Sequence, residues 1–168
     1  MTQRFMLGAI CVALSLAGSA SAQTAVQRAQ RDQIATVKND DPDMTAAFAK
    51  ARESLQDFLR LARKPRATIE RMSVKIAIRD NDKTEYFWIT PFAERDGAFV
   101  GRVANTPRSV RNVKLGEVIK FKEAEIADWS YVESKRMIGN FTACALIKKE
   151  PLPSREEFMK TYGLNCEF

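Results

Sequence analysis

The stretch 72-MSVKIAIRDNDKTEYFWIT-90 decides the fold that we expect. In its first half, Val74, Ile76 and Ile78 alternate with Lys75 and other residues, which is the period of a half-buried β-strand over residues 72–79. The run 80–83 is rich in turn residues, and residues 85–90 return as a second strand, so the stretch predicts a β-hairpin. The second strand is apolar on both faces at residues 86–89, which is typical of a central strand.

A helix is expected before this hairpin. From Met44 to Ala62, apolar residues recur at steps of three and four, and charged residues occupy the opposite face. Asp43 is the expected N-cap, because it follows Pro42 and precedes the first apolar residue. Pro65 ends the helix, since proline cannot continue the hydrogen-bonding pattern.

The region after the hairpin predicts further strands and a second helix. Strands are expected over residues 98–103, 115–121, 129–132 and 138–147, the last being the longest. Ser154 and Glu157 form an expected capping box for a short helix that Gly163 closes. The predicted fold is therefore α+β: an N-terminal amphipathic helix packed on an antiparallel sheet of about six short strands, with a short C-terminal helix, in a single domain over residues 42–168.

Residues 1–22 predict export. Arg4 precedes a mostly apolar stretch over residues 5–16, and a small-residue run then ends in Ala20, Ser21 and Ala22. This is the pattern of a secretory signal peptide cleaved between Ala22 and Gln23, and a retained N-terminal anchor is the alternative. We expect a periplasmic or secreted protein without a transmembrane segment after cleavage, and a flexible or weakly helical lead-in over residues 23–41.

The charge balance points to anionic partners. The chain has 27 Lys and Arg residues against 21 Asp and Glu, a net charge of +6. In an exported protein, we expect an anionic ligand or an acidic protein surface as the partner and no nucleic acid. The alternative is that the charge only maintains solubility. The sequence does not determine the oligomeric state.

The absence of histidine restricts the chemistry. No histidine occurs anywhere in the sequence, which excludes Ser–His and Cys–His nucleophile pairs and most catalytic zinc sites. The glycines make neither a dinucleotide-binding fingerprint nor a phosphate loop. No catalytic residue, metal site or cofactor is predicted.

Two cysteines follow the predicted leader. An even number in an oxidising compartment favours one disulfide, between Cys144 and Cys166, which would tie the C-terminal tail to a preceding strand. Two unpaired thiols are the alternative.

Several sequence blocks occur together in one known family. They are 41-DPDM-44, 75-KIAIRD-80, 85-EYFWI-89, 101-GRVANTPRSV-110, 126-IADWSY-131 and 139-GNFTACAL-146. In these blocks, over about residues 41–150, the chain resembles the YegJ-like bacterial proteins, whose family is called domain of unknown function 2314. The resemblance implies an exported, periplasmic bacterial protein, and it implies no substrate, cofactor or catalytic residue.

Two groups of residues are candidate binding sites. The first is a basic loop that can hold a phosphate, a carboxylate or an acidic protein patch; it contains Arg102, Asn105, Arg108, Arg111 and Lys114. Its alternative is a loop that is merely solvated. The second group is Asp128, Trp129 and Tyr131, whose aromatic rings lie two residues apart and can stack a ligand. Its alternative is a core tryptophan with Asp128 capping the preceding turn.

These observations lead to one functional hypothesis and two alternatives. The leading hypothesis is an exported, periplasmic, non-enzymatic binding or interaction module of unknown ligand, with an inhibitor or a protective protein as one possible form. The first alternative is a histidine-free hydrolase or transferase that uses Lys or carboxylate residues in a cleft. The second is a structural envelope protein.

Overall fold

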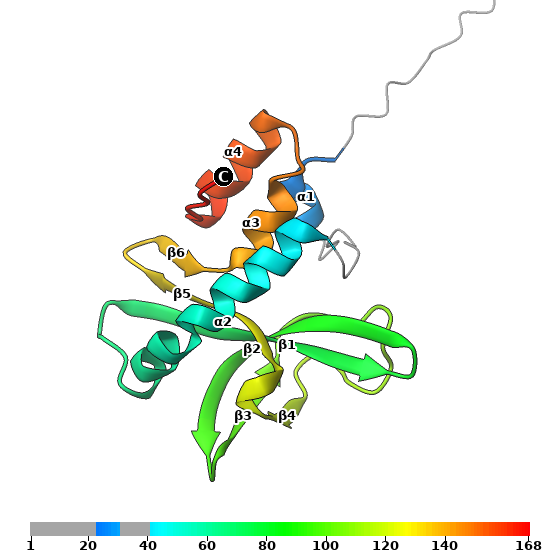
Figure 1. Ribbon diagram of the computed structural model, residues 1–168, viewed down its shortest axis with the longest axis vertical. Coiled ribbons are helices and arrows are strands. Elements are labelled where there is room, and N and C mark those ends of the chain that lie inside the picture. Colours follow the sequence, from blue (N-terminus) through cyan, green and yellow to red (C-terminus); the bar gives the residue numbers. More distant parts are fainter. Residues whose placement is uncertain (1–22, 31–40) are drawn as a thin grey trace, which may run out of the picture.

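The computed structural model describes residues 23–30 and 41–168 (Figure 1). The predicted signal peptide and residues 31–40 of the predicted lead-in lie outside the described residues. The helices are α1 (Ala25–Gln30), α2 (Pro42–Arg63), the 3-10 turn η1 (Glu123–Glu125), α3 (Phe141–Ile147) and α4 (Leu152–Tyr162). The strands are β1 (Ile69–Asp80), β2 (Lys83–Arg95), β3 (Ala98–Val103), β4 (Val118–Phe121), β5 (Ile126–Glu133) and β6 (Arg136–Gly139).

The six strands form one antiparallel sheet in the order β4-β3-β2-β1-β5-β6. The predicted α+β class and the predicted hairpin are confirmed: β1 pairs with β2, and Ile76 lies opposite Phe87. β1 is central, between β2 and β5, while β4 and β6 lie at the two edges. Leu164 of the C-terminal tail forms an isolated β-bridge with Met137 of β6. The β6 edge therefore has a neighbouring segment of the chain beside it.

Helix α2 supplies one side of the hydrophobic core. It runs diagonally across the sheet, α3 lies beside it, and α1 and α4 pack against each other beyond α3 (Figure 1). The ring of Phe58 stacks on Trp129 of β5 at 4.8 Å between centroids, and Leu55 and Leu59 are buried beside it. Each fully buried side chain of this size stabilises the fold by about 1.5–3 kcal/mol, so this contact surface holds the helix on the sheet.

The N-cap of α2 is Asp41 and not Asp43 as predicted. The Asp41 carboxylate accepts hydrogen bonds from the backbone N–H groups of Asp43 and Met44, both at 3.1 Å. Pro42 takes the first helical position, where its missing N–H costs nothing. The helix ends at Arg63, shortly before Pro65, as expected.

The predicted long strand over residues 138–147 is wrong. β6 ends at Gly139, and Asn140 adopts a left-handed conformation with φ 56° and ψ 43°. The chain then turns into α3, whose first turn is held because the Thr142 N–H donates to the Asp128 carboxylate at 2.9 Å. Gly139 also has a positive φ of 79°, and residues with positive φ do not change an apolar pattern, so the period alone could not reveal this break.

The C-terminal helix begins differently from the prediction and ends as predicted. Pro151 is its N-cap, and no side chain caps it. Ser154 lies inside the helix, where its hydroxyl accepts a hydrogen bond from the Ala25 N–H at 3.0 Å. Gly163 is the left-handed C-cap, with φ 65°. The described part of the lead-in is thus a short helix that docks on α4. Among the residues that the structure describes, no helix is both long and apolar enough to span a bilayer.

Candidate functional site

The basic loop between β3 and β4 binds a carboxylate of the chain itself. The Glu85 side chain on β2 accepts hydrogen bonds from three consecutive backbone N–H groups of the loop. Ser109 and Val110 donate to its oxygen Oε2 at 2.8 and 3.2 Å, and Arg108 donates to both oxygens at 3.0 Å. Burial opposes ionisation of Glu85, but these donors outweigh it and lower the pKa of the carboxyl below its usual 4.5. The loop is therefore anchored to the β1–β2 hairpin.

The other candidate residues of this loop also have internal contacts. The Arg111 N–H donates to the Asp80 carboxylate at 2.8 Å. The Asn105 side chain accepts the Trp88 N–H at 2.8 Å, and the Arg102 guanidinium donates to the Gly116 carbonyl at 2.6 Å. Several backbone amides that were candidates for anion binding thus bind Glu85 and Asp80 within the protein.

We expect Glu85→Ala to loosen the loop. The variant removes the acceptor of several charge-assisted hydrogen bonds, so the amides of Ser109 and Val110 should exchange hydrogen about tenfold faster than in wild type. Thr84→Ala is the matched control, because Thr84 is the exposed neighbour on β2. Unchanged exchange at both amides would contradict the anchoring role.

The same contact should depend on pH. Because the folded-state pKa of Glu85 lies below 4.5, its stabilisation is complete above that pH and is lost as the pH falls through the lowered value.

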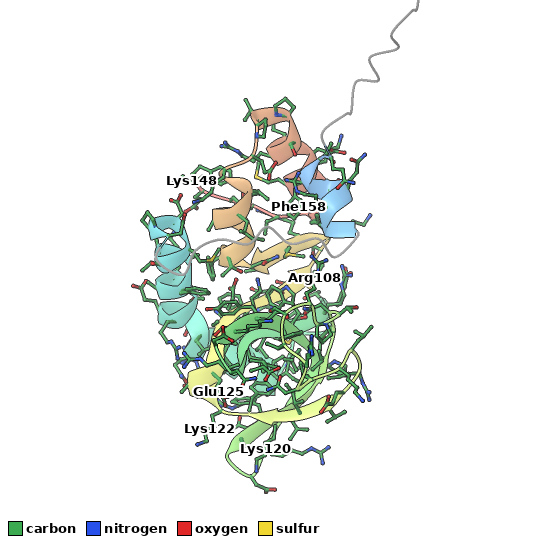
Figure 2. All side chains as sticks on the ribbon, turned by 90° about the vertical axis from the view of Figure 1, so that its right-hand side faces the viewer. Arg108, Lys120, Lys122, Glu125, Lys148 and Phe158 are labelled. Atoms are coloured by element: carbon green, nitrogen blue, oxygen red, sulfur yellow. A yellow bond between two sulfur atoms is a disulfide. The ribbon has the colours of Figure 1, made fainter. Side chains whose placement is uncertain are left out.

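The positive charge of the chain concentrates beside this loop. Residues 102–122 contain six Lys and Arg residues and one acidic residue, against 27 and 21 in the whole sequence. Leu115 and Val118, which are 57% and 53% exposed, lie in the same segment. Lys120 and Lys122 project from the end of the molecule opposite Phe158 (Figure 2). We call this surface the cationic edge; its residues are Arg102, Lys114, Leu115, Val118, Lys120 and Lys122.

None of the six salt bridges among the described residues involves the cationic edge. Arg111 and Lys114 line a shallow depression that includes Gly116, the residue contacted by Arg102. The structure therefore brings Arg102, Arg111 and Lys114 of the predicted set around one surface. Arg108 lies with its backbone on Glu85, on the hairpin side of the loop.

A groove of about 930 Å³ lies next to the cationic edge, between α2, β1 and β4. The rings of Phe48 and Tyr86 stack inside it at 5.4 Å between centroids. Burial raises the pKa of the Tyr86 hydroxyl, so this phenol stays neutral. We call this the α2–β4 groove; its charged lining residues are Arg52, Arg79, Lys120 and Glu125.

Two further grooves are smaller. One, of about 660 Å³, lies at the irregular part of β2 and is lined by Pro91 and Phe92, with the Arg63–Glu94 ion pair beside it. The other, of about 360 Å³, lies against the C-terminal tail.

Lys75 is buried, although the sequence pattern places it on the polar face of a half-buried strand. Its ammonium donates to the Thr142 hydroxyl at 2.5 Å and lies 4.5 Å from the centre of the Trp88 ring. Thr142 in turn donates to the Asp128 carboxylate at 2.6 Å. The face is covered because α3 and Trp88 pack over it. We call Lys75, Thr142 and Asp128 the buried polar cluster.

The two ionisable groups of this cluster have shifted pKa values. Burial lowers the pKa of Lys75 and raises that of Asp128, and the attraction between the two groups opposes both shifts. Asp128 also accepts the Trp129 and Thr142 N–H groups, at 2.8 and 2.9 Å. Lys75 and Asp128 line none of the three grooves. These bonds satisfy the two groups inside the protein, which is the arrangement of a structural cluster.

The aromatic candidates belong mainly to the core. Trp129 is 6% exposed, and its indole N–H donates to the Ala51 carbonyl at 3.1 Å. Tyr131 stacks on Trp129 at 6.1 Å and is partly exposed. This placement favours the structural alternative for Trp129, with Asp128 binding backbone amides at the start of α3.

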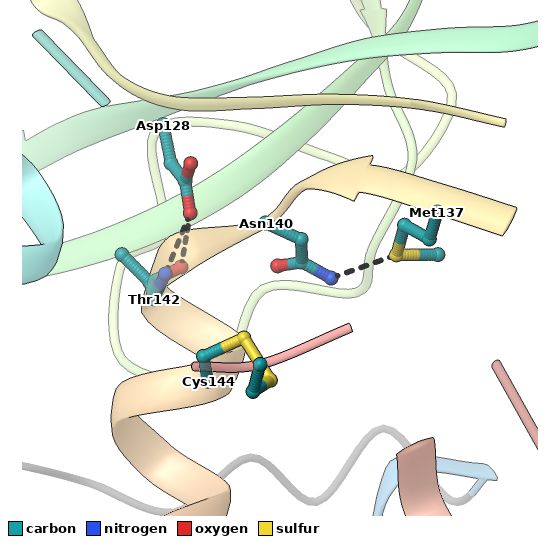
Figure 3. The surroundings of a disulfide bond; sticks show 6 residues. Asp128, Met137, Asn140, Thr142 and Cys144 are labelled. Carbon is teal, nitrogen blue, oxygen red and sulfur yellow. Dashed lines mark hydrogen bonds between the residues drawn. A yellow bond between two sulfur atoms is a disulfide. The ribbon is translucent and has the colours of Figure 1, made fainter. Parts of the chain in front are cut away.

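The expected disulfide between Cys144 and Cys166 is present, with the two Cα atoms 5.5 Å apart. It lies close to Asn140, Met137 and the Asp128–Thr142 contact (Figure 3). It ties the C-terminal tail to α3 and not to a strand, because residues 141–147 are helical. Within residues 23–30 and 41–168, no three His, Cys, Asp or Glu side chains gather into a metal site.

Sequence reasoning missed Glu85, which anchors the basic loop, and Lys75, which belongs to the buried polar cluster. Glu85 is the first residue of the predicted strand over residues 85–90, and it lies 23 residues before Arg108 of the loop that it binds. No spacing rule connects Glu85 with that loop. A lysine in an alternating strand usually lies on the solvent-exposed face, so the pattern gave no indication that Lys75 is buried.

Comparisons with known proteins give one family. A family model described as "Uncharacterized protein conserved in bacteria (DUF2314)" matches residues 41–166. The relative "Uncharacterized protein YegJ" of Escherichia coli (strain K12) is 31% identical over 126 residues, which cover 75% of this chain and 81% of the relative. No solved structure matches the chain significantly.

Proposed function

The chain belongs to the DUF2314 family of bacterial proteins, and because neither match names an activity, we propose from its surface that it is an exported, non-enzymatic module that binds an acidic protein partner. The observation that carries this proposal is the cationic edge. Most of the excess positive charge of the chain lies within residues 102–122, and it surrounds exposed Leu115 and Val118.

Such a combination suits protein recognition. The exposed apolar side chains can be buried against a partner, and the cations around them attract an acidic surface. The loop that leads into the cationic edge is held by Glu85 and Asp80, so less conformational entropy is lost on binding. A preorganised cationic surface of this kind favours partner binding over a loop that is merely solvated.

The enzymatic alternative receives less support. A catalytic Lys or carboxylate needs access to substrate as well as a shifted pKa. Lys75 and Asp128 have shifted pKa values, yet they bind each other through Thr142 and line none of the three grooves.

The structural alternative predicts a sizeable exposed apolar face. Among the described residues, four large apolar side chains are exposed, and Leu152 and Phe168 lie apart in sequence from Leu115 and Val118. Export is supported by the sequence pattern of residues 1–22 and by the Cys144–Cys166 disulfide, since disulfides persist in oxidising compartments.

The test is charge reversal on the cationic edge. We expect Lys114→Glu/Lys122→Glu to weaken binding of poly-L-glutamate by about tenfold at low salt, and binding by wild type to weaken as salt rises. Lys64→Glu/Lys160→Glu is the matched control, because it has the same net charge and changes exposed cations elsewhere. Fluorescence anisotropy measures both.

Two outcomes would contradict the proposal. Equal weakening in both variants would show that only net charge matters. Cell fractionation that finds the polypeptide in the cytoplasm with residues 1–22 attached would exclude export.

A further inference from the structure

We propose that the outer edge of β4 takes up an extended acidic peptide segment as an added β-strand, which lies along the α2–β4 groove. This inference rests on the proposed function and names the form of the acidic partner. Three observations carry it: the direction of the β4 backbone groups, the chemistry of the groove, and the charge of the edge itself.

The hydrogen-bond pattern leaves two β4 residues with outward backbone groups. Val103 donates its N–H to the Glu117 carbonyl at 2.9 Å, and its carbonyl accepts the Gly116 N–H at 2.8 Å. Bonded pairs alternate with non-bonded pairs in an antiparallel ladder, so Ile119 faces β3 with its polar backbone atoms. The N–H and C=O groups of Val118 and Lys120 therefore point away from β3, toward the open side of the sheet.

The open side of β4 adjoins a groove suited to a peptide. Ile119, Lys120 and Phe121 line the α2–β4 groove on one side, and Phe48 and Tyr86 line it with stacked rings. Alternate side chains of an added strand point in opposite directions. One set can fill the apolar part of the groove, and the other can reach the cationic side chains.

The charge of the groove selects acidic side chains. Its charged lining residues are three cations, Arg52, Arg79 and Lys120, and one carboxylate, Glu125. The Glu125 carboxylate accepts the Lys122 N–H at 2.6 Å, and the Arg52 guanidinium donates to the Ala124 carbonyl at 3.3 Å. A segment in which acidic and apolar residues alternate complements this lining.

A second copy of the chain is a poorer occupant. Pairing two β4 edges would bring together two cationic edges, including Lys120 from each copy, and like charges across a strand pair are destabilising. The opposite edge of the sheet, β6, is already bridged by Leu164. The partner is therefore a different chain that supplies carboxylates.

The experiment compares two substitutions at one position. Lys120→Ala and Lys120→Pro both remove the ammonium, but only Lys120→Pro also removes the outward N–H, while the β3–β4 ladder keeps its bonds. The probe is a labelled hexapeptide of alternating Glu and Val. We expect Lys120→Pro to bind at least about fivefold more weakly than Lys120→Ala, because an added strand loses a backbone hydrogen bond.

A second measurement does not depend on the folding of the proline variant. The same hexapeptide, N-methylated at every peptide bond, keeps its charges and side chains but offers no backbone N–H on either edge, so it cannot pair as a strand. It should bind wild type about tenfold more weakly than the unmodified peptide. The unmodified peptide should also slow hydrogen exchange at the Val118 and Lys120 amides.

The outcomes separate the two proposals. Equal binding of both peptides, with unprotected Val118 and Lys120 amides, would overturn strand addition. If Lys114→Glu/Lys122→Glu still weakens binding in that case, the cationic edge remains the binding surface. If that variant and its charge-matched control behave alike, the proposed function fails as well.

Discussion

Replacing Asp128 by alanine is expected to lower the free energy of unfolding by about 3–5 kcal/mol. Asp128 is fully buried, and its carboxylate accepts hydrogen bonds from the Trp129 N–H, the Thr142 N–H and the Thr142 hydroxyl. Its removal leaves these donors without an acceptor and leaves the Lys75 ammonium without its neighbouring opposite charge. Urea denaturation measures the effect as a lower midpoint.

Two comparisons identify the cause of this loss. Glu53→Ala is the control, because Glu53 is an exposed carboxylate on α2, and its removal should change the free energy of unfolding by less than about 0.5 kcal/mol. Adding Lys75→Met to Asp128→Ala should recover part of the loss, because the double variant no longer buries an unpaired ammonium. Strictly additive effects would contradict a coupled buried cluster.

Loss of the disulfide is expected to lower the free energy of unfolding by about 3 kcal/mol. Cys144 and Cys166 are 22 residues apart, and the bond removes loop-closure entropy from the unfolded chain. Cys144→Ser/Cys166→Ser should show this loss in urea denaturation, and reduced wild type should match it.

The control for this prediction is the double variant with and without reductant. Its stability should not respond to reductant, since Cys144 and Cys166 are the only cysteines after the predicted leader. Two thiols that react with alkylating reagent in the purified, non-reduced protein would contradict the disulfide directly.

Much of the fold follows from local patterns, and the failures have a common cause. The steps of three and four residues predict α2, and the alternation over residues 72–79 predicts β1, because each reflects which side of one element is buried. The prediction failed over residues 138–147, where Asn140 turns left-handed and α3 begins. The apolar residues there suit a buried strand and a buried short helix equally well.

The candidate site was predictable only in part. The concentration of cations over residues 102–122 is visible in the sequence, and it led to the basic loop. The hydrogen-bond partners of that loop could not be predicted. The Glu85 carboxylate accepts hydrogen bonds from backbone amides of the loop, and the Asn105 side chain accepts one from the Trp88 N–H of β2. The groove beside β4 is formed by α2, β1 and β4, which no local pattern places together.

By itself, the sequence determined the α+β class, the main helix, the hairpin and the concentration of positive charge, since these depend on the order of residues within one segment. Only the tertiary structure decided that Lys75 is buried, that Glu85 anchors the basic loop, and that β4 is an edge beside a groove. The physical reason is that burial and hydrogen-bond partners depend on what packs over a surface. Thr142, which binds the Lys75 ammonium, lies 67 residues further along the chain, and the amides that bind Glu85 lie 23–25 residues further along.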